Sequence, residues 1–288
     1  MATTRQIQRR IRSVENTAKI TKAMELVAAS KMRRAQERAL AGRPYAERLT
    51  WVLSDLAETL PQMDPDTLHP LLRRREVQNV GIVHITPNRG LCGGLPGNVN
   101  RRASALTAEA GVPAEIVAVG RKGRDYFQRA KVPVRAEFTE LGDYPEYLDI
   151  LPIARLIIDS YLAGQVDKVY LVYAFFISTV TQEPRVQQLL PIEPPQEEAT
   201  QAVDYIYEPG RDKVLAELLP RYVEMQIYGA ILEGMASEQS ARMVAMRNAS
   251  DAAGEMIEAL TLAKNKARQE QITKELLDIV GGVEGLSA

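Results

Sequence analysis

Both ends of the chain carry narrow apolar stripes whose spacing is that of a long α-helix. Residues 3–41 contain neither glycine nor proline, residues 221–280 contain no proline, and small or apolar side chains recur in both stretches in steps of three and four. Such a repeat, sustained over several heptads, predicts a left-handed coiled coil. Because each end carries one seam, we expect the two helices to pair antiparallel within the chain. The predicted seam positions are Ile7, Ile11, Val14, Ala18, Thr21, Met24, Ala28, Met32, Ala35 and Ala39 at one end, and Met225, Tyr228, Leu232, Met235, Gln239, Arg242, Met246, Ala249, Ala253, Met256, Leu260, Ala263 and Ala267 at the other.

Glycine and proline indicate where these helices bend or end. Gly42 and Pro44 are expected to bend the first helix before a further helical stretch at 45–60. Gly281 and Gly282 are expected to end the second helix, because glycine is the residue that most often follows a helix.

Two polar residues, Gln239 and Arg242, interrupt the C-terminal seam. Buried polar groups at such positions reduce stability unless they are paired. They therefore either fix the register of the helix pair or face a partner, and the seam alone does not distinguish the two.

Between the ends, short apolar runs alternate with helical segments, a pattern typical of βαβ units and a mainly parallel sheet. We therefore predict a Rossmann-like α/β domain, so that the fold class is α/β with a long antiparallel coiled coil of N- and C-terminal helices. The predicted boundaries are 1–60 for the N-terminal helix, 76–208 for the α/β domain and 211–288 for the C-terminal helix. The predicted strands are 80–85, 116–119 and 169–176, the predicted helices are 98–110, 121–130 and 145–163, and 186–190 and 202–207 are candidate late strands.

Positive charge is concentrated at the N-terminal end. Residues 1–48 carry twelve Lys or Arg against four Glu, although the whole chain has a net charge of −1. Such an arm indicates an acidic partner surface, which charge alone leaves open among nucleic acid, anionic lipid and acidic protein. The single cysteine, Cys92, excludes an internal disulfide and favours a reducing compartment. The longest apolar run, 169–177, is about half as long as a membrane-spanning helix requires.

The sequence offers no set of residues that would perform catalysis. The loop at 86–98 follows the first predicted strand but does not have the G-x-G-x-x-G spacing, and no phosphate-binding P-loop motif occurs. The segment at 120–127, GRKGRDYF, has amides and cations that could bind an anion, although a solvated loop is the simpler interpretation. His69 and His84 have no neighbours at metal-ligand spacing. We therefore predict no active site, no cofactor and no metal.

Four segments, in order along the chain, resemble the gamma subunit of rotary F-type ATP synthases. They are ITKAMELVAASKMRRAQ at 20–36, NRGLCGGL at 88–95, MASEQSARMVAM at 235–246 and NKARQEQITKELLDIVGG at 265–282, and DYIYEPG at 204–210 is similar too. The resemblance implies a non-catalytic rotor shaft inside a ring of three alpha and three beta subunits, with the α/β domain at the foot beside the epsilon subunit and the c ring. Such a shaft couples proton flow through the c ring to ATP synthesis or hydrolysis and regulates ATPase activity.

The resemblance also implies which residues meet partners. It places a group of side chains at the beta subunits, a second group at the lower rim of the ring or at the foot, and a third in an apolar bearing at the top of the hexamer. The beta-subunit contact of Arg242 requires that its side chain be exposed. The three groups are Met24, Arg242, Arg268 and Gln269; Arg89, Cys92, Tyr205 and Tyr207; and Ile272, Leu276, Ile279 and Val280.

The resemblance further implies a peripheral location on the cytoplasmic side of a bacterial cell membrane, held there through the complex. Two alternatives compete with it. A basic coiled-coil protein could bind nucleic acid through Arg5, Arg9, Arg10 and Arg12, with strong salt dependence. A Rossmann-type enzyme with helical extensions would need a cofactor motif that the sequence does not show.

Overall fold

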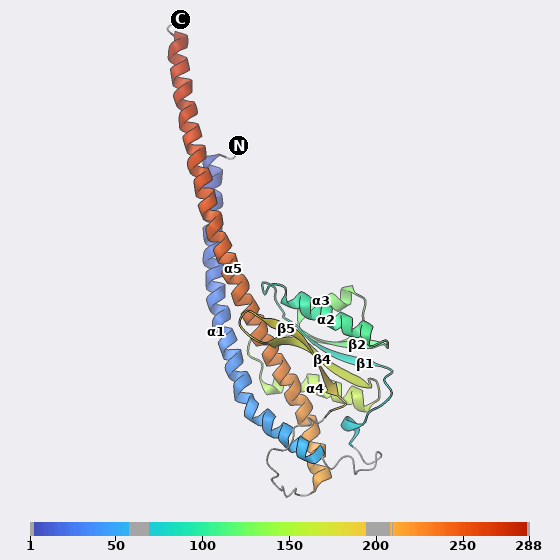
Figure 1. Ribbon diagram of the computed structural model, residues 1–288. Coiled ribbons are helices and arrows are strands. Elements are labelled where there is room, and N and C mark those ends of the chain that lie inside the picture. Colours follow the sequence, from blue (N-terminus) through green and yellow to red (C-terminus); the bar gives the residue numbers. More distant parts are fainter. Residues whose placement is uncertain (1–2, 58–68, 194–207, 209, 287–288) are drawn as a thin grey trace. The chain divides into compact units, whose positions relative to one another are not determined.

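The computed structural model describes residues 3–57, 69–193, 208 and 210–286. The chain forms two compact units, one made of Met1–Ala28 with Met243–Ala288 and the other of Ala29–Arg242. Two long helices, α1 (Thr4–Ala57) and α5 (Arg211–Leu286), contribute to both units, and a five-stranded sheet lies between them in the sequence (Figure 1). The predicted fold class, two long terminal helices and a central α/β sheet, is confirmed.

Helix α1 continues through the glycine and proline that were expected to disturb it. Gly42 and Pro44 both lie inside the helix, and the helical stretch that we predicted to follow them belongs to the same element as far as Ala57. Beyond Pro44, Leu49 and Leu53 are buried in the core of the second unit. This burial stabilises the last turns of α1, because tertiary packing contributes more to a helix than intrinsic propensity does.

Helix α5 spans Arg211–Leu286 and continues beyond its predicted end. It includes Pro220, because Leu219 and Val223 on either side are 0% exposed and their packing offsets the hydrogen bond that proline removes. It also runs through Gly281 and Gly282, so the predicted end at these residues is wrong. Each glycine costs a helix only about 1 kcal/mol, which is too little to stop it here.

In the first unit the terminal segments of α1 and α5 lie side by side and antiparallel, as predicted. Side-chain hydrogen bonds join them at several levels, and the partner on α5 moves toward the N-terminus as the partner on α1 moves toward the C-terminus. The bonded pairs are Thr4 with Gln271, Gln8 with Lys264, Thr21 with Ser250 and Glu25 with Arg247.

The predicted seam is confirmed on α1, where every predicted position is buried or half-buried. On α5 it is confirmed at Leu260 and Ala267, which are half-buried, and wrong at two positions between them and before them. Met256 is 54% exposed and Ala263 is exposed, whereas Ile257 and Lys264 are half-buried in their place. The seven-residue repeat itself continues, because Ala253, Leu260 and Ala267 stay in the seam and the position between each pair moves by one residue.

A polar layer interrupts the apolar contact between the two helices. The Glu25 side chain, only 7% exposed, accepts hydrogen bonds from Lys22 at 2.9 Å and from Arg247 at 3.1 Å. One turn away, the hydroxyls of Thr21 and Ser250 lie 2.7 Å apart. A buried polar layer of this kind is satisfied in only one alignment of the helices, so it fixes their register.

The second unit contains the sheet, with strand order β3-β2-β1-β4-β5. Four strands are parallel and β5 is antiparallel to β4, which agrees with the predicted mainly parallel sheet. The strands are β1 (Val80–Ile85), β2 (Ala114–Val119), β3 (Val134–Phe138), β4 (Lys168–Phe176) and β5 (Gln182–Leu190). The helices between them are α2 (Leu95–Glu109), α3 (Arg121–Arg129) and α4 (Tyr147–Leu162), and the short 3₁₀ turn η2 (Pro70–Leu72) precedes β1.

Strand β3 was not predicted from the sequence, because its five residues alternate between apolar and charged side chains without forming an apolar run. Strand β5 begins four residues before its predicted start at 186, at Gln182. The remaining candidate strand, 202–207, lies outside the described residues.

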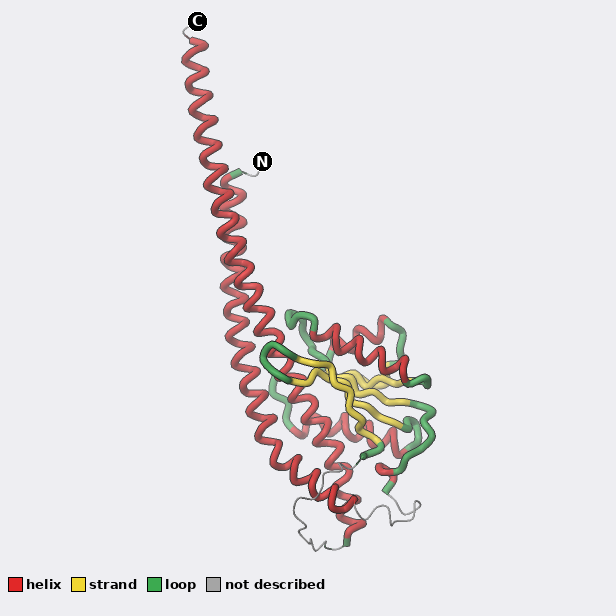
Figure 2. Tube along the Cα trace, in the orientation of Figure 1, coloured by secondary structure: helices red, strands yellow, loops and turns green. Residues whose placement is uncertain are grey.

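The sheet is covered on both faces, as Figures 1 and 2 show. Alternate strand residues such as Val83 and Ile85 join one core with α4, α5 and the end of α1, whereas Ile82 and Ala118 join the other core with α2 and α3. The period of two that separates the faces is that of a strand. As a result, the carboxyl ends of the parallel strands form one edge, where the loops after β1, β2 and β3 meet.

The polar layer yields a prediction about pH. The ammonium group of Lys22, assisted by Arg247, holds the pKa of Glu25 below its ordinary value of 4.5. The pKa of Glu25 is lower in the folded chain than in the unfolded chain. Ionised Glu25 therefore stabilises the folded chain at pH values above its unfolded pKa, and this stabilisation is lost as pH falls through its folded pKa. We expect Glu25→Gln to lower the stability of the helix pair by about 1 kcal/mol at neutral pH and much less at pH 3.

Thermal unfolding followed by helical circular dichroism measures this difference. Glu15→Gln is the matched control, since Glu15 is an exposed carboxylate on the same helix. An equal loss at both pH values would contradict the assignment of Glu25 as the ionised partner.

Candidate partner-binding surfaces

The C-terminal end of α5 exposes a row of large apolar side chains. Ile272, Leu276, Leu277 and Ile279 are between 45% and 66% exposed, and the spacing of the first, second and fourth places them on one helix face. The side chain of Val280 lies outside the described ones, although its backbone is helical. An exposed apolar row of this kind is a candidate protein contact, because leaving it in water costs free energy.

A second apolar surface lies on α1 within the same unit. Ile20, Leu26 and Val27 are more than half exposed, whereas Met24 is half-buried in the seam. Sequence analysis singled out Met24 and missed the other three. The signal was present, since these three residues are large and apolar yet fall outside the seam.

The predicted beta-subunit contacts on the first unit fall at two separate levels. Arg268 and Gln269 are exposed and lie level with the start of α1, because the nearby Gln271 bonds to Thr4. Met24 lies at the opposite end of this helix pair, beside Glu25 and its partner Arg247. The structure therefore does not bring Met24 together with Arg268 and Gln269.

Arg242, in the second unit, is not a free cation. Its side chain is 11% exposed and donates to Glu238 at 2.7 Å and to the backbone carbonyl of Gly90 at 3.2 Å. Burial raises the pKa of Glu238, and the adjacent Arg242 opposes that rise. The exposure that the predicted contact of Arg242 requires is absent in this chain, and the side chain instead anchors the loop after β1 to α5.

The loop after β1 hides its cysteine and exposes its neighbours. Cys92 is 1% exposed, its Sγ lies 3.7 Å from the carbonyl oxygen of Arg89, and burial raises the pKa of the thiol. Arg89 is exposed, and Leu91 is 62% exposed with a φ of 65°, a backbone conformation that is unfavourable for leucine. Arg89 and Leu91, rather than Cys92, are therefore exposed on the outer surface of this loop.

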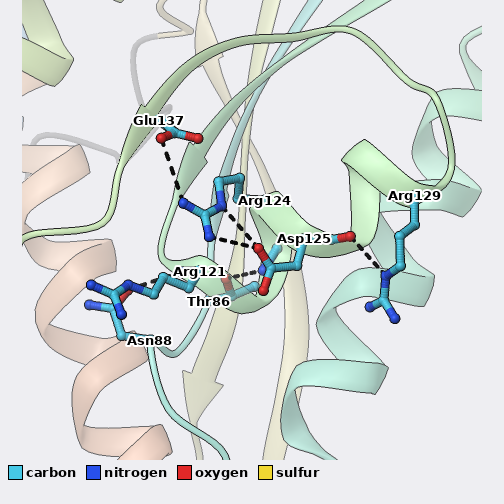
Figure 3. A network of polar contacts seen from close by, with 8 residues as sticks. Thr86, Asn88, Arg121, Arg124, Asp125, Arg129 and Glu137 are labelled. Atoms are coloured by element: carbon cyan, nitrogen blue, oxygen red, sulfur yellow. Dashed lines mark hydrogen bonds and ion pairs between the residues drawn. The ribbon is translucent and has the colours of Figure 1, made fainter.

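Phosphate sites in α/β proteins lie at the carboxyl ends of the strands, but the backbone amides at this place in the chain are not free. The first three backbone N–H groups of α3 donate to protein oxygens. Arg121 donates to Asn88 Oδ1 at 3.0 Å (Figure 3), Lys122 to the Pro87 carbonyl at 3.1 Å, and Gly123 to Thr86 Oγ1 at 2.8 Å. A helix N-terminus binds an anion through such amides only when they are free. The chain's own oxygens therefore occupy this anion position.

The cations of 120–127 are partly neutralised as well. Arg124 pairs with Asp125 at 2.8 Å and with Glu137 at 3.6 Å, and Arg129 Nε donates to the carbonyl of Asp125 at 2.9 Å (Figure 3). This network ties α3 to β3. The segment is therefore the start of helix α3 and not the solvated loop that was the simpler interpretation.

Two glycines make this tight arrangement possible. Gly120 has a φ of 104°, and a Cβ there would lie 1.9 Å from the Thr86 carbonyl oxygen. A Cβ on Gly123 would lie 2.4 Å from Nδ1 of His84. His84 is completely buried, and this burial lowers its pKa to about 3, so the imidazole is neutral at physiological pH.

The described part of the chain contains no group of three or more His, Cys, Asp or Glu side chains that could hold a metal ion. Over the same ranges no helix combines the length and apolar character needed to cross a bilayer. Tyr205 and Tyr207, predicted at the foot, lie outside the described residues.

Comparison with known proteins agrees with the resemblance in the sequence. The family model described as ATP synthase matches residues 3–286. The ATP synthase gamma chain of Dehalococcoides mccartyi strain CBDB1 is 57% identical over 287 residues, covering 100% of both chains. That of Roseiflexus castenholzii is 50% identical over 290 residues, covering 100% of this chain and 99% of its own.

Solved structures share the fold. The central stalk and c-ring structure of the Tetrahymena thermophila mitochondrial ATP synthase contains a chain that matches with a TM-score of 0.63 at 24% identity, over 80% of this chain and 99% of that one. A chain of the Euglena gracilis mitochondrial ATP synthase, in rotational state 3, matches with a TM-score of 0.66 at 19% identity, over 98% and 94%.

The packing at Gly120 predicts a large effect of one added methyl group. Gly120→Ala should lower the free energy of unfolding of the second unit by about 3 kcal/mol or more, because the clash with Thr86 adds to an unfavourable φ. Gly97→Ala is the control, since that glycine lies in α2 and its Cβ would meet only a flexible arginine side chain at 3.6 Å. Denaturant unfolding followed by the fluorescence of the single tryptophan, Trp51, measures both. Equal stabilities would contradict the packing described.

The anchoring of the loop by Arg242 predicts the reactivity of Cys92. Arg242→Gln should increase the rate at which the thiol reacts with a small aromatic disulfide several-fold, because the bond to Gly90 is lost. The same change removes a charge that lowers the pKa of Cys92, which alone would slow the reaction, so an increase reports opening of the loop. Arg268→Gln, an exposed cation on the same helix, should leave the rate unchanged, and a rate unchanged in both variants would contradict the anchoring role.

Proposed function

Because this chain belongs to the ATP synthase gamma-chain family, we propose that it is the central rotor stalk of an F-type ATP synthase. In this role it couples proton flow through the c ring to ATP synthesis or hydrolysis at the alpha and beta subunits. The observation that carries the proposal, beside the family assignment, is the exposed apolar row at Ile272, Leu276 and Ile279. A helix end of this kind requires an apolar sleeve from other subunits.

The finer contacts follow from this role. Ile272, Leu276, Ile279 and Val280 form the apolar bearing at the top of the alpha and beta hexamer. Met24, Arg268 and Gln269 meet the beta subunits at two levels, and Ile20, Leu26 and Val27 add apolar contact area there. Arg89 and Leu91 face the lower rim of the ring, and the α/β domain with Tyr205 and Tyr207 meets the epsilon subunit and the c ring.

The helix pair has the physical properties that this task needs. Its seam and polar layer hold two helices in one register, and the surface of the pair is uneven around its axis. Exposed Ile20, for example, lies on a different side of α1 from the exposed cations Lys19 and Lys22. A rotor with unlike faces presents different chemistry to each beta subunit as it turns, so identical catalytic sites are driven into different states and ATPase activity is regulated by rotor position.

The chain itself supplies no chemistry in this proposal. ATP is made and hydrolysed at the catalytic subunits, and this chain is the non-catalytic subunit that changes their conformation. It is held at the cytoplasmic side of the membrane through the complex. The family assignment favours this role over the nucleic-acid-binding alternative, and the occupied amides at the start of α3 favour it over a Rossmann-type enzyme.

Reconstitution with alpha and beta subunits tests the proposal. We expect the wild-type chain to promote assembly of a hexamer that hydrolyses ATP and turns the chain in steps. The triple variant Ile272→Ser, Leu276→Ser, Ile279→Ser should assemble less well, because the bearing loses its apolar contact. The control Glu270→Ser, Thr273→Ser, Lys274→Ser makes as many substitutions in the same helical stretch without removing apolar area.

Two outcomes would overturn parts of the proposal. If the wild-type chain neither joins nor activates the hexamer, the rotor role is wrong. If both triple variants assemble as the wild type does, the apolar end is not a bearing.

A further inference from the structure

We propose that Asp143 and Tyr144 form a latch that holds the middle of α1 on the α/β domain. The two residues lie in the segment between β3 and α4, and their partners are three cations of α1, Lys31, Arg34 and Arg38. All five residues belong to the second unit. The spacing of the cations places them on one side of the helix, facing the segment.

The contacts combine an ion pair with two cation–π contacts. Lys31 Nζ lies 2.6 Å from Asp143 Oδ2, and Arg34 donates to the Tyr144 hydroxyl at 3.2 Å. The guanidinium carbons of Arg34 and Arg38 lie 5.6 and 5.2 Å from the centre of the Tyr144 ring. Both distances are within the range in which a cation is attracted to an aromatic face.

The two long helices are attached to the α/β domain differently. Helix α5 is bonded to the sheet and its hairpin by Ser237, which donates to the Ala174 carbonyl at 2.9 Å, and by Ser240, which donates to the Thr179 carbonyl at 2.7 Å. Among the described side chains of residues 29–50, the hydrogen bonds and ion pairs from α1 to the α/β domain all go to Asp143 and Tyr144. Among the described side chains, the latch is therefore the polar attachment of this stretch of α1.

The consequence is mechanical, and it rests on the proposed function. If the foot of the chain is turned by a ring, torque enters the helices through the α/β domain. Helix α5 receives it through buried bonds to the sheet, and α1 receives it in this stretch through the latch. Asp143 and Tyr144 thus act as positioning residues that make the two helices turn as one body.

Hydrogen exchange on the isolated full chain tests the latch without the rest of the complex. In the double variant Asp143→Asn, Tyr144→Leu, amides of residues 29–41 should exchange about tenfold faster, the size expected when two cation–π contacts and one surface ion pair are lost together. Asp143→Glu and Tyr144→Phe keep the charge and the ring, so each should stay close to wild type. Leu148→Ala is the control, because that side chain is 68% exposed just beyond the latch. Unchanged exchange in the double variant would overturn the latch.

Torsional stiffness of the rotor in the assembled complex tests the mechanical role. Angular fluctuations of a probe fixed to the chain should widen in the double variant and return to the wild-type range in Tyr144→Phe. If the double variant shows faster exchange but wild-type fluctuations, the latch holds α1 on the α/β domain but does not carry torque. If the wild-type chain fails to assemble, the proposed function is contradicted. The exchange result does not depend on assembly, because it is measured on the isolated chain.

Discussion

Helix α5 must satisfy two different packing partners with a single helical period, and the rest of the structure depends on this constraint. Around Leu219, Val223 and Ile227 it is part of the core beneath the sheet, and around Met246 and Ala253 it packs against α1. Its backbone hydrogen bonding is continuous between the two stretches. The path along the backbone from one stretch to the other therefore contains no loop.

The α/β domain shows how a nucleotide-type architecture can serve as a structural support. In open α/β sheets, ligands bind outside the carboxyl ends of the strands, where loops and helix N-termini offer free amides. Here Thr86, Pro87 and Asn88 supply the oxygens that a phosphate would bring, and Gly120 lets the two loops approach closely enough for them to do so. The same edge is covered by α5, whose residues Ile231 and Met235 line the remaining cavity of about 240 Å³. The backbone amides that could bind a ligand at this edge of the sheet instead bond the start of α3 to the loop after β1.

The parts of the structure that follow from local pattern could be predicted, and the parts that depend on distant contacts could not. The stripe of α1 and the strands β1 and β4 follow from periodicity and apolar runs, which are properties of neighbouring residues. The shift of a seam position from Met256 to Ile257 was not predicted, because either residue fits a repeat with steps of three and four. Strand β3 was not predicted because its alternation includes Arg135 and Glu137. The burial of Arg242 could not be predicted from the sequence, because its side chain donates to the carbonyl of Gly90, which is distant along the chain. The contact surfaces are intermediate cases, since an apolar residue outside a seam signals a contact without naming what it meets.

The shielded thiol of Cys92 has a practical consequence. It is the only cysteine in the chain, it is buried, and its raised pKa keeps it protonated at neutral pH. The native protein is therefore close to a cysteine-free background for chemical labelling. A cysteine introduced on the exposed surface would carry a fluorophore, a spin label or a surface tether almost alone, with the original residue left in place.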